Sequence, residues 1–432
     1  MKGVYEMITD FNFQLKNVGL INNANIKLSK INVICGDNST GKSTSSKILY
    51  SFLRSNSKTR KELTKNTLID NVLDLTSDMN RFYMYSRNDS ENKIPLSNDI
   101  RTIYNEIRRK EFDDEDIDII NYYRQIIEIF NDYQLRYTST NIFDKPISNI
   151  NRLITIYEEE GEDLFNSIMN LIIRSEFGKT VLKNNEVSFS GKFNKIPFEY
   201  TGHLMNSGMK TEGGLIIEEV FYLESLSNFD LFSRGGSQNT EHVNHVFNCI
   251  KSDYSKVWAD EITNEEIIKI EEKLFEITCG SFVYDDGNII YNDEFLMKNT
   301  ASGIKQIGLI QMLLNNRQLK ENSFLIIDEP EVNLHPKWQI KFAEILVLLA
   351  RDLNITIYCN THSPLFIEAI RTYSEQQDLL DETNFYLTYE SKEFQNKYDI
   401  KYISNENLSI IYNSLGKPYE TLSEISIENQ FK

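Results

Sequence analysis

Residues 31–44, which read I-N-V-I-C-G-D-N-S-T-G-K-S-T, decide the fold that we predict for this chain. The first five, 31–35, are mostly β-branched and predict a buried strand. Residues 36–43 fit G-x-x-x-x-G-K-[ST], the phosphate-binding loop found between a strand and a helix. Gly36 and Gly41 allow the loop to curl until its backbone N–H groups point at phosphate oxygens. The stretch therefore predicts a nucleotide-binding α/β protein.

Two side chains of the loop have direct tasks in binding a triphosphate. Lys42 supplies a cation for the β- and γ-phosphates, and Ser43 offers its hydroxyl to Mg²⁺. A helix that opens at Lys42 also directs the positive end of its dipole at the same anion. A Gly/Ser turn can match the pattern by chance, but here a predicted strand precedes the loop and a predicted helix follows it.

The composition indicates a folded globular protein. The chain has 432 residues, of which 40% are hydrophobic and 12% aromatic, enough for more than one structural unit. No run of residues approaches the roughly 20 apolar positions of a membrane span. The opening M-K-G-V-Y-E-M-I-T-D lacks the apolar core of a signal peptide. We therefore expect a cytoplasmic protein with no membrane partner.

The net charge limits the partners that we expect, and the cysteines limit the disulfides and metal sites. The formal net charge of -18 argues against a uniformly basic nucleic-acid binder, although a local basic patch stays open. The four cysteines, Cys35, Cys249, Cys279 and Cys359, are scattered and form no C-x-x-C pair. We expect reduced thiols, with Cys35 and Cys359 buried in core strands, and neither disulfides nor a metal cage.

Both ends of the chain are expected to form the nucleotide-binding domain. Residues 1–57 would be its N-terminal part, 58–179 a helical insertion, and 180–432 its C-terminal part. The insertion is charged and poor in glycine, and apolar residues recur in it at helical spacings of three and four. These residues, which suit one side of a helical hairpin, are Ile119, Tyr123, Ile126, Phe130, Tyr133 and Tyr137.

Several other elements follow from local patterns. We predict a hairpin of strands 11–17 and 24–28 with its turn at Asn22-Asn23, and a second hairpin over 282–291. Further segments show strand or helix character. They are strands at 186–189, 197–200, 216–226, 384–389 and 397–403, and a short helix at 408–414.

Two features have both a functional and a structural interpretation. The acidic run 111–116 is expected to be a solvated helix start, with a docking face for a basic partner as the alternative. His242, His245 and Cys249 fall on one face of a predicted helix. We expect a polar helix face there, because three donors on one helix cannot surround a zinc ion alone.

Two apolar strands in the second half of the chain end in chemically active residues. The strand 324–327 is followed by Asp328, which would hold the Mg²⁺ shell. Glu329 would be the general base, or would position the water that attacks the γ-phosphate. The strand 355–359 leads to His362, whose imidazole can hydrogen-bond the γ-phosphate.

A small-residue turn at 299–306 opens another apolar helix. Free N–H groups and the positive dipole end make such a helix start an anion site. Ser302 and Gly303 lie at this start. Without the other motifs, the turn would be only a Ser-Gly helix cap.

Taken together, these motifs resemble the ABC-class ATPases of the SMC and RecF type. The phosphate loop, the Ser-Gly helix start, D-E-P-E-V-N-L-H-P at 328–336 and T-H-S-P at 361–364 occur in the family's order. The resemblance is closer to bacterial ATPases grouped with the OLD family and to the antiphage ATPases of Septu, PARIS and abortive-infection systems. It implies an ABC-type P-loop NTPase head, with a mixed central sheet, helices and an antiparallel β subdomain.

The resemblance also assigns roles to individual residues. It makes 302–303 the signature, 328–329 the Walker B pair, 331–335 the D-loop with Asn333 facing nucleotide, and His362 the switch histidine. The Walker A loop would bind ATP through Gly36, Asp37, Asn38, Ser39, Thr40, Gly41, Lys42, Ser43 and Thr44.

The sequence departs from the family pattern in three places. Ala301 occupies the usual position of the signature serine, with Ser302 one place later. No glutamine is clearly placed as the Q-loop residue, and Gln238 is a weak candidate. The tail after Pro364 has no acidic D-x-D cluster, so we expect the TOPRIM nuclease of OLD proteins to be absent.

The resemblance implies that two copies sandwich ATP, in a homodimer or a higher even oligomer. Lys42 of one copy and Ser302 of the other would then grip one nucleotide, and hydrolysis through Glu329 would release them. The charge of -18 favours a separate protein effector, such as a nuclease or toxin, in antiphage defence. A RecF-like ATPase that clamps DNA is the alternative. A transporter subunit and a non-hydrolysing scaffold are further readings.

Overall fold

A computed structural model of the chain describes residues 11–57, 102–103, 106, 119–137, 144, 147–148, 150–151, 154–155, 161–178, 188–193, 196–201, 204–207, 217–224, 240–251, 265–285 and 288–430. The chain groups into two compact units, one of residues 1–58, 169–233 and 240–432, and one of residues 59–168 and 234–239. The larger unit carries the sheets and every predicted site residue that the structure describes. The division into an interrupted ATPase and an insertion at 58–179 stays a prediction.

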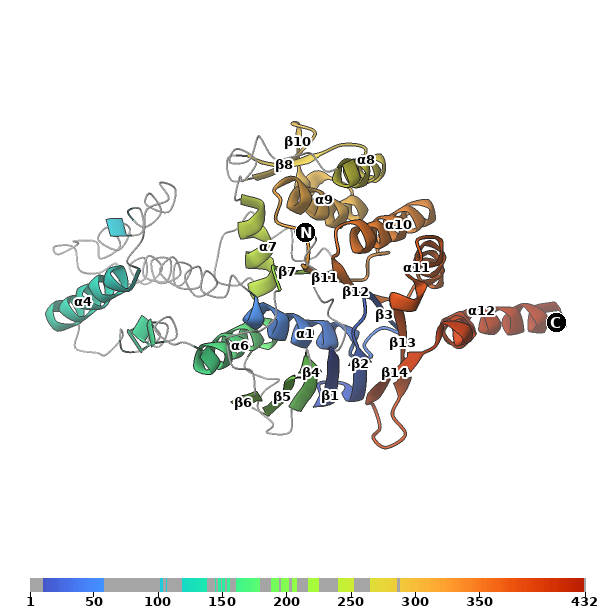
Figure 1. Cartoon of the computed structure of the whole chain (residues 1–432), viewed down its shortest axis with the longest axis horizontal. Coiled ribbons are helices and arrows are strands. Elements are labelled where there is room, and N and C mark those ends of the chain that lie inside the picture. Colours follow the sequence, from blue (N-terminus) through green and yellow to red (C-terminus); the bar gives the residue numbers. More distant parts are fainter. Residues whose placement is uncertain are drawn as a thin grey trace, which may run out of the picture. The chain divides into compact units, whose positions relative to one another are not determined.

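The larger unit is built on a mixed sheet whose strand order is β6-β5-β4-β1-β2-β14-β13-β3-β12-β11-β7 (Figure 1). Its described strands are β1 (Asn12–Val18), β2 (Ile21–Lys27), β3 (Ile31–Cys35), β4 (Ser188–Phe193), β5 (Ile196–Thr201), β6 (Leu204–Ser207), β7 (Val220–Leu223), β11 (Phe324–Asp328), β12 (Thr356–Thr361), β13 (Thr383–Glu390) and β14 (Tyr398–Ile403). Five strands that are neighbours in the sheet are parallel to one another: β13, β3, β12, β11 and β7. Strands β2, β1, β4, β5 and β6 form an antiparallel wing.

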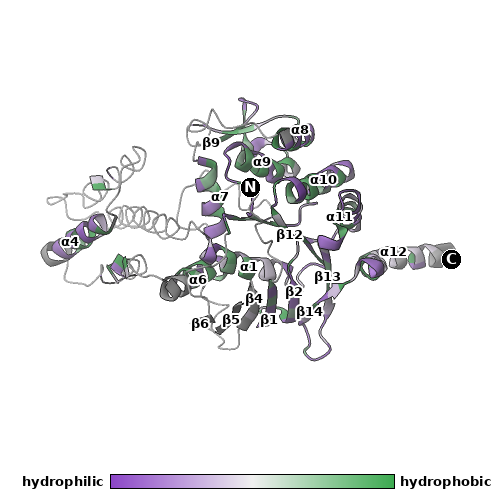
Figure 2. Ribbon diagram, viewed as in Figure 1, coloured by the Kyte–Doolittle hydropathy of each residue, from purple (hydrophilic) through white to green (hydrophobic). Residues whose placement is uncertain are grey.

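Helices cover both faces of the parallel strands. The described helices are α1 (Lys42–Asn56), α4 (Ile119–Tyr137), α6 (Gly161–Phe177), α7 (Glu241–Lys251), α8 (Glu265–Thr278), α9 (Ser302–Asn315), α10 (Pro336–Asp352), α11 (Pro364–Gln376) and α12 (Ser409–Gln430). Helix α1 contacts β7, β11 and β12, and the main hydrophobic core lies between the sheet and α9, α10 and α11. Helix α9 is mostly hydrophobic along its length (Figure 2).

Successive side chains of a strand point to opposite faces of the sheet, so one strand contacts the helices on both faces. On β12, Ile357 and Cys359 belong to the hydrophobic core cluster, while Tyr358 and Asn360 bond to side chains of α1. Strand β12 is fully buried, so polar residues on its α1 side need partners. Those partners come from Ser45 and Ser46 of α1.

A small antiparallel sheet of β8 (Phe282–Asp285), β9 (Asn288–Tyr291) and β10 (Phe295–Leu296) adds a second layer. It confirms the hairpin predicted at 282–291. The N–H of Phe282 donates to Gln311 Oε1 at 3.2 Å, which ties this sheet to α9. The predicted fold class, an α/β head with a mixed central sheet and an antiparallel subdomain, is confirmed.

The first predicted hairpin is correct, but its turn was placed wrongly. Strands β1 and β2 pair through Val18 and Ile21, so the turn is at Gly19 and Leu20, not at Asn22-Asn23. Gly19 adopts the left-handed conformation, with φ +57°, that a tight turn requires. Asn22 lies within β2, where its amide donates to Asp399 at 2.9 Å. A long-range side-chain partner therefore overrides a local turn signal.

Other predictions differ in extent. Of the strand expected over 216–226, the described residues 217–224 contain Val220–Leu223 as β7. No predicted strand corresponds to β6, and the final helix runs on from Ser409 to Gln430. The helical pattern at 119–137 is confirmed by α4, in which Tyr123, Ile126 and Phe130 are buried. The acidic run 111–116 and Gln238 lie outside the described residues. None of the described helices combines the length and apolar character of a membrane span.

Candidate nucleotide-binding and hydrolysis site

The predicted phosphate loop connects the end of β3 to the start of α1. Gly41 precedes the helix with φ +95°, and a Cβ there would lie 2.7 Å from Ile21 Cγ1, so only glycine fits without displacement. Ser39 also has a positive φ, of 61°. No side chain caps the N-terminus of α1, so its first N–H groups are available to an anion. Asp37, Asn38, Ser39 and Ser43 are exposed at the surface, Thr44 is half-buried, and Thr40 is buried.

Lys42 curls back over the loop that precedes it. Its ammonium donates to the carbonyls of Gly36 at 2.8 Å and Asp37 at 2.6 Å. Burial lowers the pKa of Lys42, and the nearby carboxylates of Asp328 and Glu329 act in the opposite direction. The cation is thus held at the centre of the loop, as phosphate binding requires.

Asp328 ends β11, two strands from the phosphate loop, and is almost fully buried. Its Oδ1 accepts from Asn360 Nδ2 at 2.7 Å, and its Oδ2 accepts from the Tyr222 hydroxyl at 3.4 Å. The same Asn360 amide donates to Ser46 of α1 at 2.7 Å. Asn360 therefore orients the carboxylate and links it to the helix that carries Ser43.

The donor set fits Mg²⁺. The hydroxyl of Ser43 and the carboxylate of Asp328 are hard oxygen donors, which Mg²⁺ prefers. The described residues contain no group of three or more His, Cys, Asp or Glu side chains placed to hold a metal ion.

Glu329 sits in a backbone conformation that glutamate rarely adopts. Its φ is +51°, and its N–H donates to the carbonyl of Asn360 at 2.9 Å. A left-handed non-glycine residue costs on the order of 1–3 kcal/mol, and such residues cluster at functional sites. Burial, with a smaller contribution from Asp328, raises the pKa of Glu329. A carboxylate with a raised pKa is a better proton acceptor near neutral pH.

His362 follows the end of β12 beside the same carboxylates. Its Nδ1 is 3.2 Å from Glu331 Oε1 and 4.0 Å from Glu329 Oε1. Glu331 is buried and also accepts from the Thr361 hydroxyl and the His362 N–H, each at 2.8 Å. Glu331 thereby ties the segment after β11 to the end of β12.

The strand register explains why these residues meet. Cys35 of β3 pairs with Thr361 of β12, and Asn360 of β12 pairs with Asp328 of β11. The phosphate loop, His362 and the Asp328–Glu329 pair therefore lie at the carboxyl ends of adjacent parallel strands. Ligands of open α/β sheets bind at this edge.

The predicted signature lies against the predicted D-loop. Gly303 approaches the Asn333 carbonyl so closely that a Cβ on Gly303 would lie 2.3 Å from that oxygen. Asn333 has φ +60°, and both Asn333 and Ser302 are exposed. No hydrogen bond joins Ser302 to the phosphate loop in the described part of the chain. The structure thus brings Gly303 of the predicted signature against Asn333 of the predicted D-loop, with Ser302 exposed beside Gly303.

Several site residues were missed by sequence reasoning. Asn360 orients Asp328, and Gln306 Nε2 donates to the carbonyls of Leu223 and Asp328, each at 3.3 Å. Glu224 follows the end of β7, and it forms an ion pair with Lys47 of α1 at 2.9 Å. Asn360, next to the predicted T-H-S-P motif, carried a usable signal, because a buried amide in an apolar strand needs polar partners.

His242, His245 and Cys249 form a polar face of α7, as expected, but this face does not lie at the surface. All three side chains are buried. His242 pairs with Glu176 at 2.7 Å, and His245 pairs with Glu219 at 3.0 Å. Long-range carboxylates that the sequence pattern does not reveal provide these partners. Cys35 and Cys359 are buried and free, as predicted.

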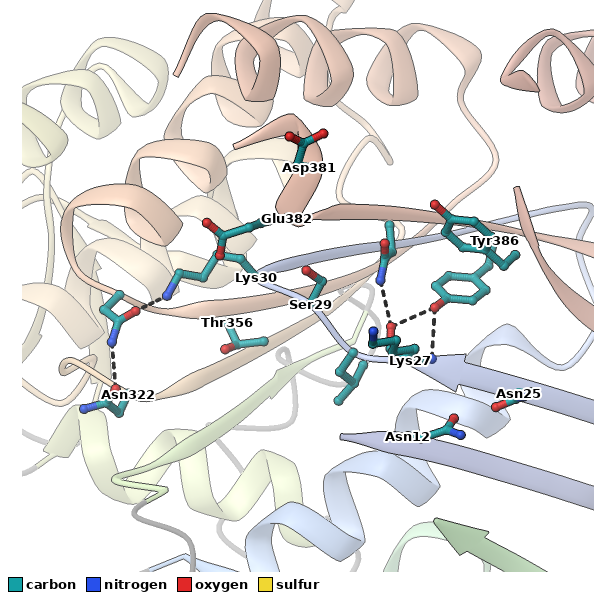
Figure 3. Close-up of a pocket in the computed structure, with 14 residues that line it drawn as sticks. Asn12, Asn25, Lys27, Ser29, Lys30, Asn322, Thr356, Asp381, Glu382 and Tyr386 are labelled. Atoms are coloured by element: carbon teal, nitrogen blue, oxygen red, sulfur yellow. Dashed lines mark hydrogen bonds between the residues drawn. The ribbon is translucent and has the colours of Figure 1, made fainter. Parts of the chain in front are cut away.

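A separate cavity of about 660 Å³ lies at the opposite edge of the sheet (Figure 3). Its lining includes Lys30, Asn322 and Asn354, which precede β3, β11 and β12. Asn354 donates to Asn322 at 2.7 Å, and Lys30 bonds to Asn354. These polar groups satisfy one another, and the cavity takes no part in the site at the carboxyl ends.

The chain is similar to a protein family and to several solved structures. Residues 31–368, well over half of the chain, match the family described as "AAA domain, putative AbiEii toxin, Type IV TA system". The SMC head domain from Thermotoga maritima is similar at 9% identity and a TM-score of 0.35, covering 91% of this chain and 99% of that one. The SmcHead bound to the C-winged helix domain of ScpA has 9% identity, a TM-score of 0.38 and coverages of 91% and 98%.

A third similar structure is the Smc head domain with an extended coiled coil bound to the C-terminal domain of ScpA derived from Pyrococcus furiosus. It has 10% identity and a TM-score of 0.34, and covers 96% of this chain and 99% of that one. The family match includes the phosphate loop, Asp328, Glu329 and His362. The chain therefore belongs to the AAA domain family described as putative AbiEii toxin, Type IV TA system.

Proposed function

We propose that this protein binds and hydrolyses ATP at the carboxyl ends of β3, β12 and β11. One observation carries the proposal: adjacent parallel strands bring Lys42, Asp328, Glu329 and His362 to one edge of the sheet. Lys42 and the N-terminus of α1 would hold the phosphates. Ser43 and Asp328 would hold Mg²⁺, which supplies charge neutralisation on the phosphate oxygens.

Glu329 is proposed to take the proton of the attacking water. Its raised pKa and its fixed backbone suit a general base. His362, within 4.0 Å of the Glu329 carboxylate, would donate a hydrogen bond to the γ-phosphate from the same side. Asn360 keeps Asp328 in place while Glu329 acts.

We further propose that ATP is shared between two copies, in a dimer or a higher even oligomer. Ser302, Gly303 and Asn333 form a second cluster, and Ser302 at the uncapped start of α9 is exposed. A second copy could present these residues to the phosphate loop of the first. Association would then depend on the γ-phosphate, and hydrolysis would reverse it, as in other γ-phosphate switches.

The switch is proposed to act in the cytoplasm on a separate effector, such as a nuclease or toxin, in antiphage defence. The family description names a putative toxin and a Type IV TA system, which supports this class of function. The net charge of -18 favours a protein partner over nucleic acid. The absence of a TOPRIM nuclease, expected from the sequence, is part of this proposal.

The experiment compares Glu329→Gln with Glu321→Gln, an exposed glutamate in the turn before β11. Loss of the general base should reduce ATP turnover by about 10²–10⁴-fold. On size-exclusion chromatography with saturating ATP and Mg²⁺, Glu329→Gln should elute as a dimer. Glu321→Gln should keep the wild-type rate and elution.

A Glu329→Gln chain that stays monomeric while binding ATP would contradict the shared nucleotide. A wild-type chain that neither binds nor hydrolyses ATP would contradict the whole proposal. Duplex DNA should leave the wild-type rate unchanged, and a strong salt-sensitive stimulation would instead support a DNA clamp.

A further inference from the structure

A chain of ionic contacts runs from α6 to α1 through the buried side chain of His242. Nδ1 of His242 is 2.7 Å from Glu176 Oε2, and its Nε2 is 3.5 Å from Glu224 Oε2. The other oxygen of Glu224 is 2.9 Å from the ammonium of Lys47. Both His242 and Glu176 have fully buried side chains. His242 therefore bridges the buried carboxylate of Glu176 and the partly exposed carboxylate of Glu224, an arrangement that favours its protonated form.

This chain ends beside the proposed Mg²⁺ ligands. In the sheet, Ile327 pairs with Leu223, so Asp328 and Glu224 are the next residues of two adjacent strands. Lys47 lies four residues after Ser43 on α1, on the same helix face. Glu224 and Lys47 thus flank the position where Ser43 and Asp328 would hold the cation.

A second contact connects His242 to the same site. Its ring lies 4.7 Å, centroid to centroid, from that of Tyr222. The Tyr222 hydroxyl donates to Asp328 Oδ2 at 3.4 Å. One imidazole therefore supports both a carboxylate and a hydroxyl at the end of β7.

The C-terminal end of α6 is hydrogen-bonded to the first turn of α7. The N–H of Glu241 donates to Ser175 Oγ at 2.8 Å, and the N–H of His242 donates to Glu176 Oε1 at 3.1 Å. These α6 side chains cap the first turn of α7, where a carboxylate is favourable. A displacement of the end of α6 would therefore move His242 directly.

We infer that His242 is a positioning residue of the ATPase site, which holds Glu224 and Tyr222 beside Asp328, and that α6 acts on this site through Glu176. The inference rests on the proposed function. Partners that orient the groups around a metal site typically change metal affinity or activity by about 10–100-fold.

His245 provides a matched control on the same helix. It is also buried, its Nε2 is 3.0 Å from Glu219 Oε1, and its Nδ1 is 3.0 Å from Arg54. Glu219 precedes β7, so this ion pair lies at the end of the strand away from Asp328. Removing either imidazole breaks a similar buried pair, but only His242 contacts Glu224 and Tyr222.

The test measures ATP hydrolysis at saturating ATP as a function of Mg²⁺ concentration. The variants are His242→Gln, Glu176→Gln and His245→Gln, each compared at equal folded protein by circular dichroism. We expect His242→Gln to lower turnover or raise the half-maximal Mg²⁺ concentration by about tenfold. Glu176→Gln should change the same quantity in the same direction. His245→Gln should leave both turnover and the half-maximal Mg²⁺ concentration unchanged.

Glu224→Gln, at a partly exposed position, provides the same readout if His242→Gln does not fold. The double variant Glu224→Gln/His242→Gln should be no worse than the stronger single variant, because the two residues act together. Equal effects of His242→Gln and His245→Gln, or no effect of His242→Gln, would overturn the inference. A wild-type chain without ATP hydrolysis would instead be a failure of the proposed function, seen before any variant is compared.

Discussion

At the scale of single residues, the site combines strained backbone with close packing. Glu329 and Asn333 both have positive φ angles, and Gly303 lies against the Asn333 carbonyl. Strained positions persist only where their surroundings hold them. Here the Glu329 N–H is held by the Asn360 carbonyl, and Glu331 is held by Thr361. The segment 329–333 is therefore a rigid connection between the proposed general base and the proposed intersubunit contact.

Replacing Gly303 by alanine tests this close approach. The added Cβ would lie 2.3 Å from the Asn333 oxygen and 2.9 Å from its carbonyl carbon, so backbone has to move. We expect a loss of about 1–3 kcal/mol in the free energy of unfolding, with reduced ATP-dependent association. Urea denaturation and size-exclusion chromatography measure the two effects.

Gly416→Ala is the control, because a Cβ at Gly416 meets nothing within 4 Å. In α12 it should be neutral or stabilise the protein by up to about 1 kcal/mol. Wild-type stability and association in Gly303→Ala would show that the contact has no such role.

Replacing Asn360 by alanine tests the orientation of Asp328. The change removes two buried hydrogen bonds, to Asp328 and to Ser46, and leaves the carboxylate of Asp328 without its amide donor. We expect the free energy of unfolding to fall by about 1–3 kcal/mol and the half-maximal Mg²⁺ concentration to rise.

Asn384→Ala serves as a comparison, since that amide makes an exposed bond to the Lys27 carbonyl. Its cost should be smaller and its Mg²⁺ dependence unchanged. An Asn360→Ala protein with wild-type Mg²⁺ dependence would mean that Asp328 is oriented by its other contacts.

At the scale of elements, α7 joins α1, α6 and β7 through buried charges. Arg54 of α1 pairs with Glu219 at 2.6 Å and with Glu241 of α7 at 3.4 Å. A buried ion pair that loses one partner costs several kcal/mol, because the remaining charge stays desolvated. These buried ion pairs therefore stabilise the packing of α7 against α1 and β7, separately from the contacts of His242 with Glu176 and Glu224.

The charge of His242 predicts that stability falls at high pH. Burial opposes protonation, but Glu176 and Glu224 outweigh it and raise the pKa of His242 to about 9. This value lies above about 6.5 for an unfolded histidine. The stabilisation is therefore complete below about pH 6.5 and is lost as the pH rises through about 9.

Urea denaturation at pH 7, 8, 9 and 10 measures this loss, which should be on the order of 3 kcal/mol for His242. The variant His242→Gln should be less stable at pH 7 and should show a flatter decline. A decline of equal slope in the wild type and His242→Gln would assign the loss of stability to other groups.

At the scale of the whole molecule, the net charge opposes self-association. Each chain carries a formal charge of -18, so two copies repel one another in dilute salt. A nucleotide held between Ser302 of one copy and Lys42 of the other has to overcome this repulsion. The γ-phosphate would therefore be needed in both sites before the copies stay together.

The proposed dimer should form more readily when salt is added. Raising NaCl from 50 to 300 mM shortens the screening length from about 14 Å to about 6 Å. With Glu329→Gln, ATP and Mg²⁺, the protein concentration at half-dimerisation should fall, as measured by analytical ultracentrifugation. ADP in place of ATP is the control and should give monomers at both salt concentrations. Weaker association at 300 mM would indicate that opposite charges dominate the contact.

The sequence alone determined the order of the motifs and the elements that carry them. Ile31–Cys35 is continuous and β-branched, and the glycine loop follows it directly, so β3 and α1 could be predicted from local pattern. The same holds for Phe324–Asp328 and for the strand that leads to His362. Each of these predictions depends only on residues that are close neighbours in the sequence.

Only the tertiary structure decided which side chains serve those motifs. Asn360 and Tyr222 reach Asp328 because β7, β11 and β12 are in one register. The burial of His242 likewise depends on Glu176, 66 positions away in the chain. Such contacts leave no local pattern, because they arise from strand pairing and helix packing between distant segments, and neither can be read from neighbouring residues alone.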